Sequence, residues 1–562
     1  MNTLSKSLLA LLFAAFVLFG CDGAEDSLVN SRLNDNPVPD ISFDADPGSA
    51  DFSLTVNIGN SLTAGFMDGA LYDLGQQNSI GVLLNRQLQA VGAQEQFNQP
   101  DINSANGFNS GASNPGAGVI LGRFKLDPTI PGPSPLSEGE LIGPFEGDRS
   151  ALHNFGVPGI QVGQLLTPNT GTPDAPGFNP FYARFASNPG TSTILGDVIA
   201  AQPTFFTLWI GNNDVLGYAL SGATNPAVFT SVADFQERFG ATVNTLMANT
   251  NAKGLVTDIP SILAIPLFRA VPYNAVELDQ DTADQLNAAF AALNEFYALI
   301  AANPLVPFTE ADRDQRSVSF QAGANPVLVQ DPDLEDLTPI LDLLESIDQI
   351  SPEQRAAIQP YVQARQLTVN EQTGPELLLL SAATVLGTLA DPNNPLSQIG
   401  VVVPLSAQFH LTAANIVEIE TRRQTFNAIM EQTVGAANQT AGETRLAFYN
   451  TNAAGSSFVN LWGLDGSQPG IEIGPQRLMP DFSPAGVFST DGVHPNSRGN
   501  ALVVNDMIAV IEDAFGASIP RLSNTDILNL PSVQICAGDC VSDANAGRAA
   551  DFNPSRLFMI QD

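Results

Sequence analysis

Residues 205–210, FFTLWI, restrict the possible folds of this chain more than any other segment. Thr207 is the only polar residue in the run, so both faces of the segment are apolar. A strand that is covered on both sides in a parallel sheet has this composition. Other short apolar runs bounded by turn residues occur at 54–58, 255–259 and 446–449. The sequence therefore predicts short strands in a mainly parallel sheet.

Helical patterns separate and follow these runs. Apolar residues recur at helical spacing in two places: Phe235, Phe239, Val243 and Leu246, then Val504, Ile508, Ile511 and Phe515. Stripes of this kind predict helices that pack one face on a core. The alternation of strands and helices predicts a layered α/β fold. A chain of 562 residues can bury a large core and still carry insertions.

Two stretches interrupt this alternation. Residues 92–148 are rich in Gly, Pro, Asn and Ser, with little periodicity, and predict a long loop over one face. Residues 272–400 carry apolar helical patterns at 286–300, 337–347 and 377–389. We interpret this second stretch as an inserted helical cap. The fold-forming domain is then divided into residues 51–271 and 401–522, and residues 523–562 form a C-terminal tail.

The N-terminus predicts export. Lys6 precedes an apolar run, 8–20, that is too short to span a bilayer as a helix, so residues 1–20 are expected to be a signal peptide. The run ends in LFGC, which resembles the cleavage and lipidation site of bacterial lipoproteins and predicts a lipidated Cys21. A buried cysteine after an ordinary signal peptide is the alternative. Residues 21–50 are polar and predict a flexible tether.

On that resemblance the protein belongs to the bacterial cell envelope. Its lipid anchor would hold it at the outer membrane or the cell surface, with the membrane as a partner through Cys21. Two further cysteines, Cys536 and Cys540, enclose a turn-prone loop, and an oxidising compartment would favour a disulfide between them. Zinc binding is a weak alternative, because two cysteines without nearby histidines make an incomplete site.

The charge of the chain excludes one class of partner. Asp and Glu total 58 against 22 Lys and Arg, which gives a net charge of -36. Such a surface repels nucleic acid phosphates, so nucleic acid binding is not expected. The acids are spread along the chain, as in proteins of salt-loving organisms, where salt screens the repulsion. An ordinary acidic secreted protein has the same composition.

The stretch IGNSLTAGF places Ser61 directly after a predicted strand. Serine between glycines is common in turns, so the residue needs partners before a catalytic role follows. His494 is preceded by Asp491 at three residues, within reach to accept a ring N–H and leave the other ring nitrogen for Ser61. The other histidines, His153 and His410, have no acidic residue close by in sequence and are expected to be structural.

Donors for an oxyanion are predicted at two other strand ends. Asn213 stands in GNND, directly after the apolar run 205–210, and its amide is able to point into a site there. Gly159 in NFGVPG offers a backbone N–H that no side chain blocks, and the N–H of Ser61 is the third donor. Helix capping by Asn213 and a turn at Gly159 are the alternatives. Asp214 is expected to brace its loop, and Asp68 to be a solvated charge.

Four segments in this order resemble the blocks of the SGNH hydrolases, also called the GDSL esterases and lipases: GNSLTAG, NFGVPG, GNND and DGVHPN. The resemblance implies a flavodoxin-like three-layer α/β/α sandwich. It implies Ser61 as nucleophile, His494 as base, Asp491 as its orienting acid, and an oxyanion hole from Ser61, Gly159 and Asn213, with no metal or organic cofactor. Asn60 replaces the family's aspartate, which is expected to alter local electrostatics or turn rigidity without loss of catalysis.

The expected function is that of a lipid-anchored serine esterase or lipase that cleaves carboxylic esters through an acyl-enzyme. The apolar helices of the insertion favour lipid or medium-chain esters, although support of the fold explains them equally well. Two alternatives remain at this point: a polysaccharide deacetylase of the same family, and a non-catalytic surface lipoprotein that binds lipid or glycan.

Overall fold

The structure is a computed structural model that describes residues 43–538, except 131 and 305. The predicted signal peptide, the lipidation site Cys21 and the disulfide partner Cys540 lie outside the described residues. The described residues from Asp46 onward belong to one compact unit. The Asp46 N–H donates to the Ser518 carbonyl at 3.0 Å, so the packed chain begins inside the predicted tether, 21–50.

The centre of the fold is a five-stranded sheet in which all strands are parallel. Its spatial order is β4 (Asn154–Gly156), β1 (Thr55–Gly59), β5 (Phe205–Trp209), β6 (Lys253–Thr257) and β15 (Leu446–Tyr449). Every residue of β1 and β5 is buried. The prediction of an α/β fold around a parallel sheet is therefore confirmed.

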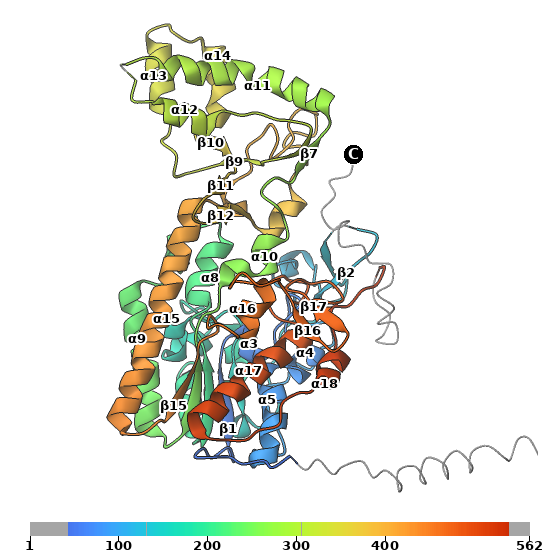
Figure 1. The fold of residues 1–562 in the computed structure, drawn as a ribbon, viewed down its shortest axis with the longest axis vertical. Helices are drawn as coiled ribbons and strands as arrows, with labels where there is room; N and C mark the ends of the chain where they lie inside the picture. Colours follow the sequence, from blue (N-terminus) through green and yellow to red (C-terminus); the bar gives the residue numbers. More distant parts are fainter. Residues whose placement is uncertain (1–42, 131, 305, 539–562) are drawn as a thin grey trace, which may run out of the picture. The chain divides into compact units, whose positions relative to one another are not determined.

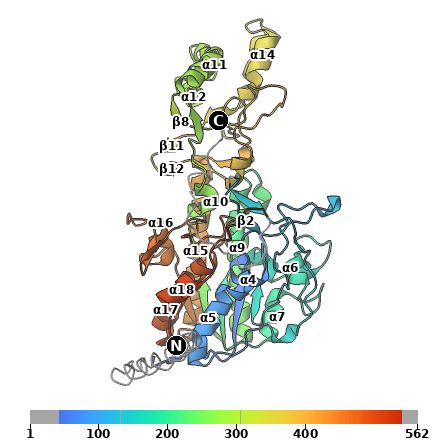
Figure 2. The same ribbon diagram turned by 90° about the vertical axis from the view of Figure 1, so that its right-hand side faces the viewer.

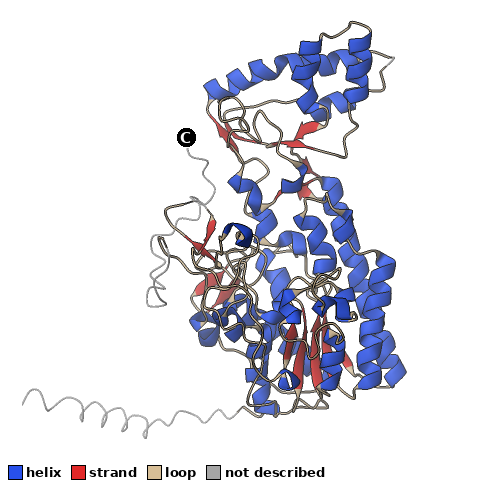
Figure 3. Cartoon of the chain, turned by 180° about the vertical axis from the view of Figure 1, so that it is seen from behind, coloured by secondary structure: helices blue, strands red, loops and turns tan. Residues whose placement is uncertain are grey.

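Helices cover both faces of this sheet (Figures 1 and 3). On one face lie α9 (Val232–Asn249) and α15 (Ala413–Ala441), and on the other lie α5 (Ile80–Leu88) and α17 (Ser497–Phe515). The predicted stripe on α9 packs inward, where the Phe235 ring stacks on the Phe426 ring at 3.8 Å. The sequence did not predict β4 or α15.

The order of the strands creates a crevice at one place. The chain passes from β1 outward to β4, then crosses back to β5 on the other side of β1. Loops that leave two neighbouring parallel strands in opposite directions open a crevice at the carboxyl ends of those strands. Ser61 follows β1, and Asn213 follows β5 as the first residue of α8 (Asn213–Leu220).

The predicted insertion forms a subdomain with a hydrophobic core of its own. The chain enters it after α10 (Pro266–Arg269) and returns to the sheet through α15. Its helices are α11 (Gln280–Ala301), α12 (Glu310–Arg316), α13 (Thr338–Ser346) and α14 (Pro352–Ile358). Its short strands are β7 (Val276–Leu278), β8 (Gly323–Asn325), β9 (Leu328–Gln330), β10 (Ala364–Gln366), β11 (Val369–Asn370), β12 (Gly374–Pro375) and β13 (Leu377–Leu378). The subdomain extends past the predicted end at residue 400, because β14 (His410–Leu411) pairs with β13.

One predicted helix of the insertion is wrong. Residues 377–389 contain no α-helix; they begin with β13, which pairs antiparallel with β14, and continue into a short 3-10 helix, Leu380–Thr384. Leu377, Leu378 and Leu379 are all buried, so the apolar run marks a covered strand and not the face of a helix. Short apolar runs do not distinguish these two cases.

The remaining elements are short. The predicted loop 92–148 contains one hairpin, β2 (Phe124–Leu126) with β3 (Pro133–Pro135). The others are α3 (Ser61–Ala64), α4 (Asp73–Gln77), α6 (Pro180–Ala183), α7 (Ile194–Ala200), α16 (Ser457–Trp462), β16 (Ile471–Ile473), β17 (Gln476–Leu478) and α18 (Asn524–Asn529). In the predicted tail, α18 lies beside α17 (Figure 2), where Arg498 donates to the Leu528 and Leu530 carbonyls. Among the described helices, none combines the length and the hydropathy needed to cross a bilayer.

Candidate active site

The turn between β1 and α3 holds Ser61 at the carboxyl end of the sheet. Asn60 caps α3, because its Oδ1 accepts the Leu62 N–H at 3.0 Å. A Cβ atom at Gly59 would lie 2.4 Å from the Trp209 carbonyl oxygen of the neighbouring strand, so only glycine fits there. Ser61 is buried, with 8% of the residue exposed. Local sequence thus fixes the position of the hydroxyl with little freedom.

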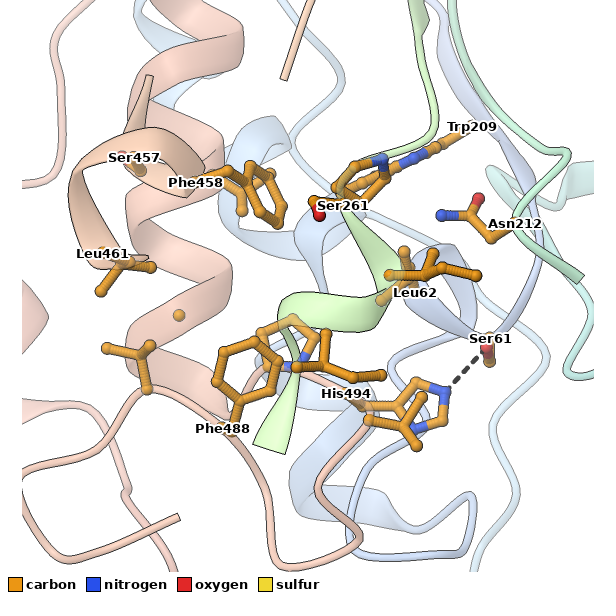
Figure 4. Close-up of a pocket in the computed structure, with 18 of the residues that line it drawn as sticks. Ser61, Leu62, Trp209, Asn212, Ser261, Ser457, Phe458, Leu461, Phe488 and His494 are labelled. Carbon is orange, nitrogen blue, oxygen red and sulfur yellow. Dashed lines mark hydrogen bonds between the residues drawn. The ribbon is translucent and has the colours of Figure 1, made fainter. Parts of the chain in front are cut away.

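The structure brings Ser61 together with both of its predicted partners. The Ser61 Oγ lies 2.8 Å from the His494 Nε2 (Figure 4). The His494 Nδ1 lies 2.9 Å from the Asp491 Oδ2. The serine and the histidine are 433 positions apart in the chain. The three side chains form a continuous hydrogen-bonded chain from a hydroxyl through an imidazole to a carboxylate, which is the arrangement that activates a serine nucleophile.

Asp491 is held as a carboxylate by several donors. Its Oδ1 accepts the N–H groups of Val493 and His494 at 2.8 and 2.9 Å, and its Oδ2 also accepts the Gly69 N–H at 2.9 Å. Burial alone would raise the pKa of Asp491, but the charge of His494 and these hydrogen bonds outweigh it and lower the pKa to about 2. The ionised acid orients the ring so that the Nδ1 carries the proton and the Nε2 is free to accept one from Ser61.

Asn213 and Gly159 lie on adjoining loops at the same edge of the sheet. The Asn213 Nδ2 donates to the Ile160 carbonyl at 2.8 Å, which ties the start of α8 to the residue that follows Gly159. Gly159 adopts φ +80° and is exposed. Within the described part of the chain, its N–H donates to no other group. The two predicted donors are therefore close to one another, and the second amide hydrogen of Asn213 is not used by that bond.

The structure places the other predicted residues in supporting positions. His153 accepts the Asn98 N–H at its Nδ1 at 2.9 Å, and the His410 Nε2 lies 2.7 Å from the Gln330 carbonyl in the insertion. Asp214 accepts the Val162 N–H at 2.9 Å and the Thr230 hydroxyl at 2.8 Å, and burial raises its pKa to about 6. It braces the loop after β5, as expected from the sequence.

Asp68 is not the solvated charge that the sequence predicted. It is 4% exposed, and its carboxylate accepts the Thr490 N–H at 2.9 Å, the Thr490 hydroxyl at 2.7 Å and the Tyr72 hydroxyl at 2.7 Å. Burial raises its pKa, although the positive charge of Arg123 opposes this. Thr490 directly precedes Asp491, and the next N–H after Asp68, from Gly69, donates to the Asp491 carboxylate. Asp68 therefore positions the loop that carries the candidate acid.

Sequence reasoning missed Asp68 because its role depends on a contact across 422 positions of the chain. The backbone conformation of Asp68 also marks this residue as unusual, but it is visible only in the structure. Asp68 adopts φ +55°, a left-handed conformation in which most residues other than glycine are rare. Its backbone N–H also donates to the Ser489 hydroxyl at 3.0 Å, so both the main chain and the side chain of this turn hold the loop before His494.

We expect Asp68→Ala to lower kcat for ester hydrolysis by about 10- to 100-fold with little change in KM, because the loop of the acid and base loses its brace. Asp68→Asn is the matched control, since its Oδ1 can accept from Thr490 while its Nδ2 donates to the Tyr72 hydroxyl. Steady-state kinetics of both variants measure the effect. A rise in KM alone, or equal losses for the two variants, would contradict a positioning role.

A cavity lies beside Ser61 (Figure 4), with about 60 Å³ of space that the centre of a water molecule can occupy. It is lined mainly by apolar side chains that end or follow β1, β5 and β6, and by others from α16, from the loop 487–493 and from α17: Leu62, Trp209, Leu216, Ile262, Ile265, Phe458, Leu461, Trp462, Val487, Phe488, Val493, Leu502 and Val503. The predicted insertion, 272–400, contributes none of these residues. The apolar cover that the sequence assigned to the insertion is thus built by the sheet domain.

Comparison of the chain with protein-family models, with curated proteins and with solved structures returns no match. The chemistry of the site is therefore inferred from its geometry. Across residues 43–538, apart from 131 and 305, no group of three or more His, Cys, Asp and Glu side chains is arranged to hold a metal ion.

Proposed function

We propose that this protein is a serine hydrolase of carboxylic esters with the SGNH arrangement of catalytic groups. The observation that carries the proposal is the hydrogen-bonded chain from Ser61 through His494 to Asp491. Its place supports the same proposal: numbered along the chain, the sheet has the strand order 2-1-3-4-5, the flavodoxin-like order, and the serine follows the strand beside the crevice. The four sequence blocks meet there.

In the proposed mechanism, the His494 Nε2 takes the proton of the Ser61 hydroxyl as the Oγ attacks the ester carbonyl. The negative charge on the former carbonyl oxygen is stabilised by the N–H groups of Ser61 and Gly159 and by the amide of Asn213. His494 then gives its proton to the leaving alcohol, and an acyl-enzyme remains on Ser61. Water attacks this ester with His494 as base, and the carboxylic acid leaves. Asp491 stays ionised throughout and stabilises the imidazolium.

The cavity beside Ser61 favours the acyl chain as the part of the substrate that the protein recognises. Its apolar lining would bury an aliphatic chain, and each buried methylene contributes about 0.8 kcal/mol. An extended apolar cavity is not needed for an acetyl group. We therefore favour medium-chain or lipid esters over acetylated polysaccharide. Attachment to the bacterial envelope through Cys21 remains a proposal from the sequence.

The test uses the chain from Asp22 onward with p-nitrophenyl esters from acetyl to palmitoyl. We expect kcat/KM to rise by about fourfold per added methylene until the cavity is full, which is the rate equivalent of about 0.8 kcal/mol. A fluorophosphonate probe should label wild-type protein and fail to label Ser61→Ala. Leu461→Trp, which fills the cavity, should reduce turnover of long esters more than of acetyl ester.

Two results would count against this function. A kcat/KM that is highest for the acetyl ester and does not rise with longer acyl chains would indicate a deacetylase. Folded protein that neither turns over any ester nor reacts with the probe would indicate a binding lipoprotein without catalysis.

A further inference from the structure

One buried amide in the cavity beside Ser61 has no part in the proposed mechanism. Asn212 is 6% exposed and lies among the apolar side chains that line this space. Its Oδ1 accepts the Asn60 Nδ2–H at 3.0 Å. Within the described residues, its own Nδ2 donates to no other group, so two N–H bonds are left for whatever fills the cavity. This amino group is not among the fully buried polar atoms without a partner, so it faces the open space of the cavity.

The neighbouring side chain fixes which end of Asn212 faces the cavity. The Asn60 Oδ1 is occupied by the Leu62 N–H, so the end of Asn60 that meets Asn212 is its amino group. A donor needs an acceptor, and Asn212 must therefore turn its Oδ1 toward Asn60 and its Nδ2 away from it. An aspartate at position 60 would accept instead, and would reverse Asn212. The identity of residue 60 thus sets the polarity that the cavity presents.

The amide lies at the reactive end of the cavity. Asn60 adjoins Ser61 in the chain and is bonded to Asn212, while Leu461 lies at the opposite end in Figure 4. Ser261 adds a second polar group to the lining, and within the described part of the chain its hydroxyl bonds to no other residue. A group that enters from Ser61 therefore meets hydrogen-bond donors first and an apolar wall further in.

We propose that Asn212 selects esters of acids that carry an oxygen acceptor on one of the first carbons of the acyl chain, followed by an aliphatic tail. This inference rests on the proposed ester hydrolysis and names its substrate class. A purely aliphatic chain would leave the Asn212 amide unpaired in an apolar space, whereas a hydroxyl or ether oxygen at that depth would accept from it. A site built around a buried donor discriminates against analogues that lack the acceptor.

The experiment compares pairs of p-nitrophenyl esters that differ in one atom. The pairs are 2- or 3-hydroxyhexanoyl against the methyl analogue at the same carbon, and 2- or 3-methoxyhexanoyl against the ethyl analogue, each as separate enantiomers. We expect the wild type to favour the oxygenated member of at least one methoxy pair by about tenfold or more in kcat/KM. Asn212→Leu, which keeps the size and removes the donor, should abolish or reverse that preference.

Asn60→Asp gives a sharper control, because it reverses the amide without changing its position. The methoxy group only accepts hydrogen bonds, so its preference should disappear in this variant. The hydroxyl also donates, so the preference for a hydroxyacyl ester should persist. Thermal unfolding of each variant checks that the fold is intact. A structural defect would lower the rates of all esters together and would not separate the two kinds of pair.

Binding keeps this test independent of turnover. Calorimetry with Ser61→Ala and the corresponding free acids should show the same preference and the same reversal in an added Asn212→Leu. Hydrolysis of plain hexanoyl ester with no preference for oxygen at either carbon would overturn the specificity and leave the hydrolase intact. An equal loss on every ester in Asn212→Leu would also overturn it. If the protein bound the oxygenated acids selectively but turned over no ester, the proposed hydrolase activity would be wrong and the proposed binding site would stand.

Discussion

Ser61→Ala is expected to reduce kcat/KM for p-nitrophenyl esters by at least about 10⁴-fold, the scale on which other serine hydrolases lose activity without their nucleophile. The Ser61 Oγ lies 2.8 Å from the His494 Nε2, so the variant retains the base, the ionised Asp491 and the oxyanion donors but has no atom that can form the acyl-enzyme. The residual rate would come from water activated by His494. Initial rates across the ester series measure the loss.

The fold should survive this change. Alanine is a good helix former, and the cap of α3 comes from Asn60, which the substitution leaves in place. Ser497→Ala is the matched control, because Ser497 is also the buried first residue of a helix and lies outside the site. We expect it to keep wild-type turnover. Undiminished turnover by folded Ser61→Ala would show that another group is the nucleophile.

The sheet could be predicted where strands are apolar on both faces. The run 446–449 coincides with β15, and 205–210 contains β5, because a covered parallel strand admits few polar residues. The sequence did not predict β4, because this strand has only three residues and one of them, Asn154, is polar. Its residues were noticed only as a possible donor segment.

Helix α15 was missed for a different reason. Its inward positions Ile416, Ile419, Phe426 and Met430 follow helical spacing, but Arg423 occupies the middle of the stripe. That arginine is buried because it donates to the Ile259 carbonyl at 2.8 Å and pairs with Glu420. A buried charged residue that is stabilised by such partners hides the amphipathic pattern from which helices are predicted.

Some features of the candidate site could be predicted from the sequence and others could not. The relation of Asp491 to His494 lies within one turn and was visible in the sequence. The cavity was not, since its walls come from five separate parts of the chain between Leu62 and Val503. The pairing of Asn60 with Asn212 joins residues 152 positions apart. Contacts of that range become visible only when the strand order is known.

The second large effect is expected in the insertion, where Arg365→Leu should destabilise the protein by about 3–5 kcal/mol. The Arg365 guanidinium contacts the Asp331 Oδ2 at 2.5 Å and both Glu376 carboxylate oxygens at 2.7 Å. The side chains of Arg365, Asp331 and Glu376 are 5%, 4% and 2% exposed. Glu376 also accepts the Ala413 N–H at 2.9 Å, at the first residue of α15. Removing Arg365 would leave two buried carboxylates unpaired at the junction of the insertion with the sheet domain.

Denaturant unfolding and limited proteolysis within residues 272–411 measure this loss. Arg355→Leu is the control. Arg355 contacts Asp342 at 2.6 Å and Glu345 at 3.1 Å, but the three side chains are 27%, 58% and 35% exposed, so a loss below about 1 kcal/mol is expected. Equal losses in the two variants would show that burial of the Arg365 cluster does not determine its contribution.

Acid should reduce the difference in unfolding free energy between the wild type and Arg365→Leu. Burial alone would raise the pKa of Glu376, but the hydrogen bonds and charge of Arg365 outweigh it and lower the pKa from 4.5. A carboxyl group with a lowered pKa stabilises the folded state above pH 4.5, its ordinary pKa. This stability is lost as the pH falls through the pKa of the group in the folded state. In the variant Glu376 lacks its cation, so burial favours the protonated form and acid removes a penalty instead. The gap between the two unfolding free energies should therefore narrow below about pH 4.5, and a gap that stays constant to pH 3 would contradict this electrostatic account.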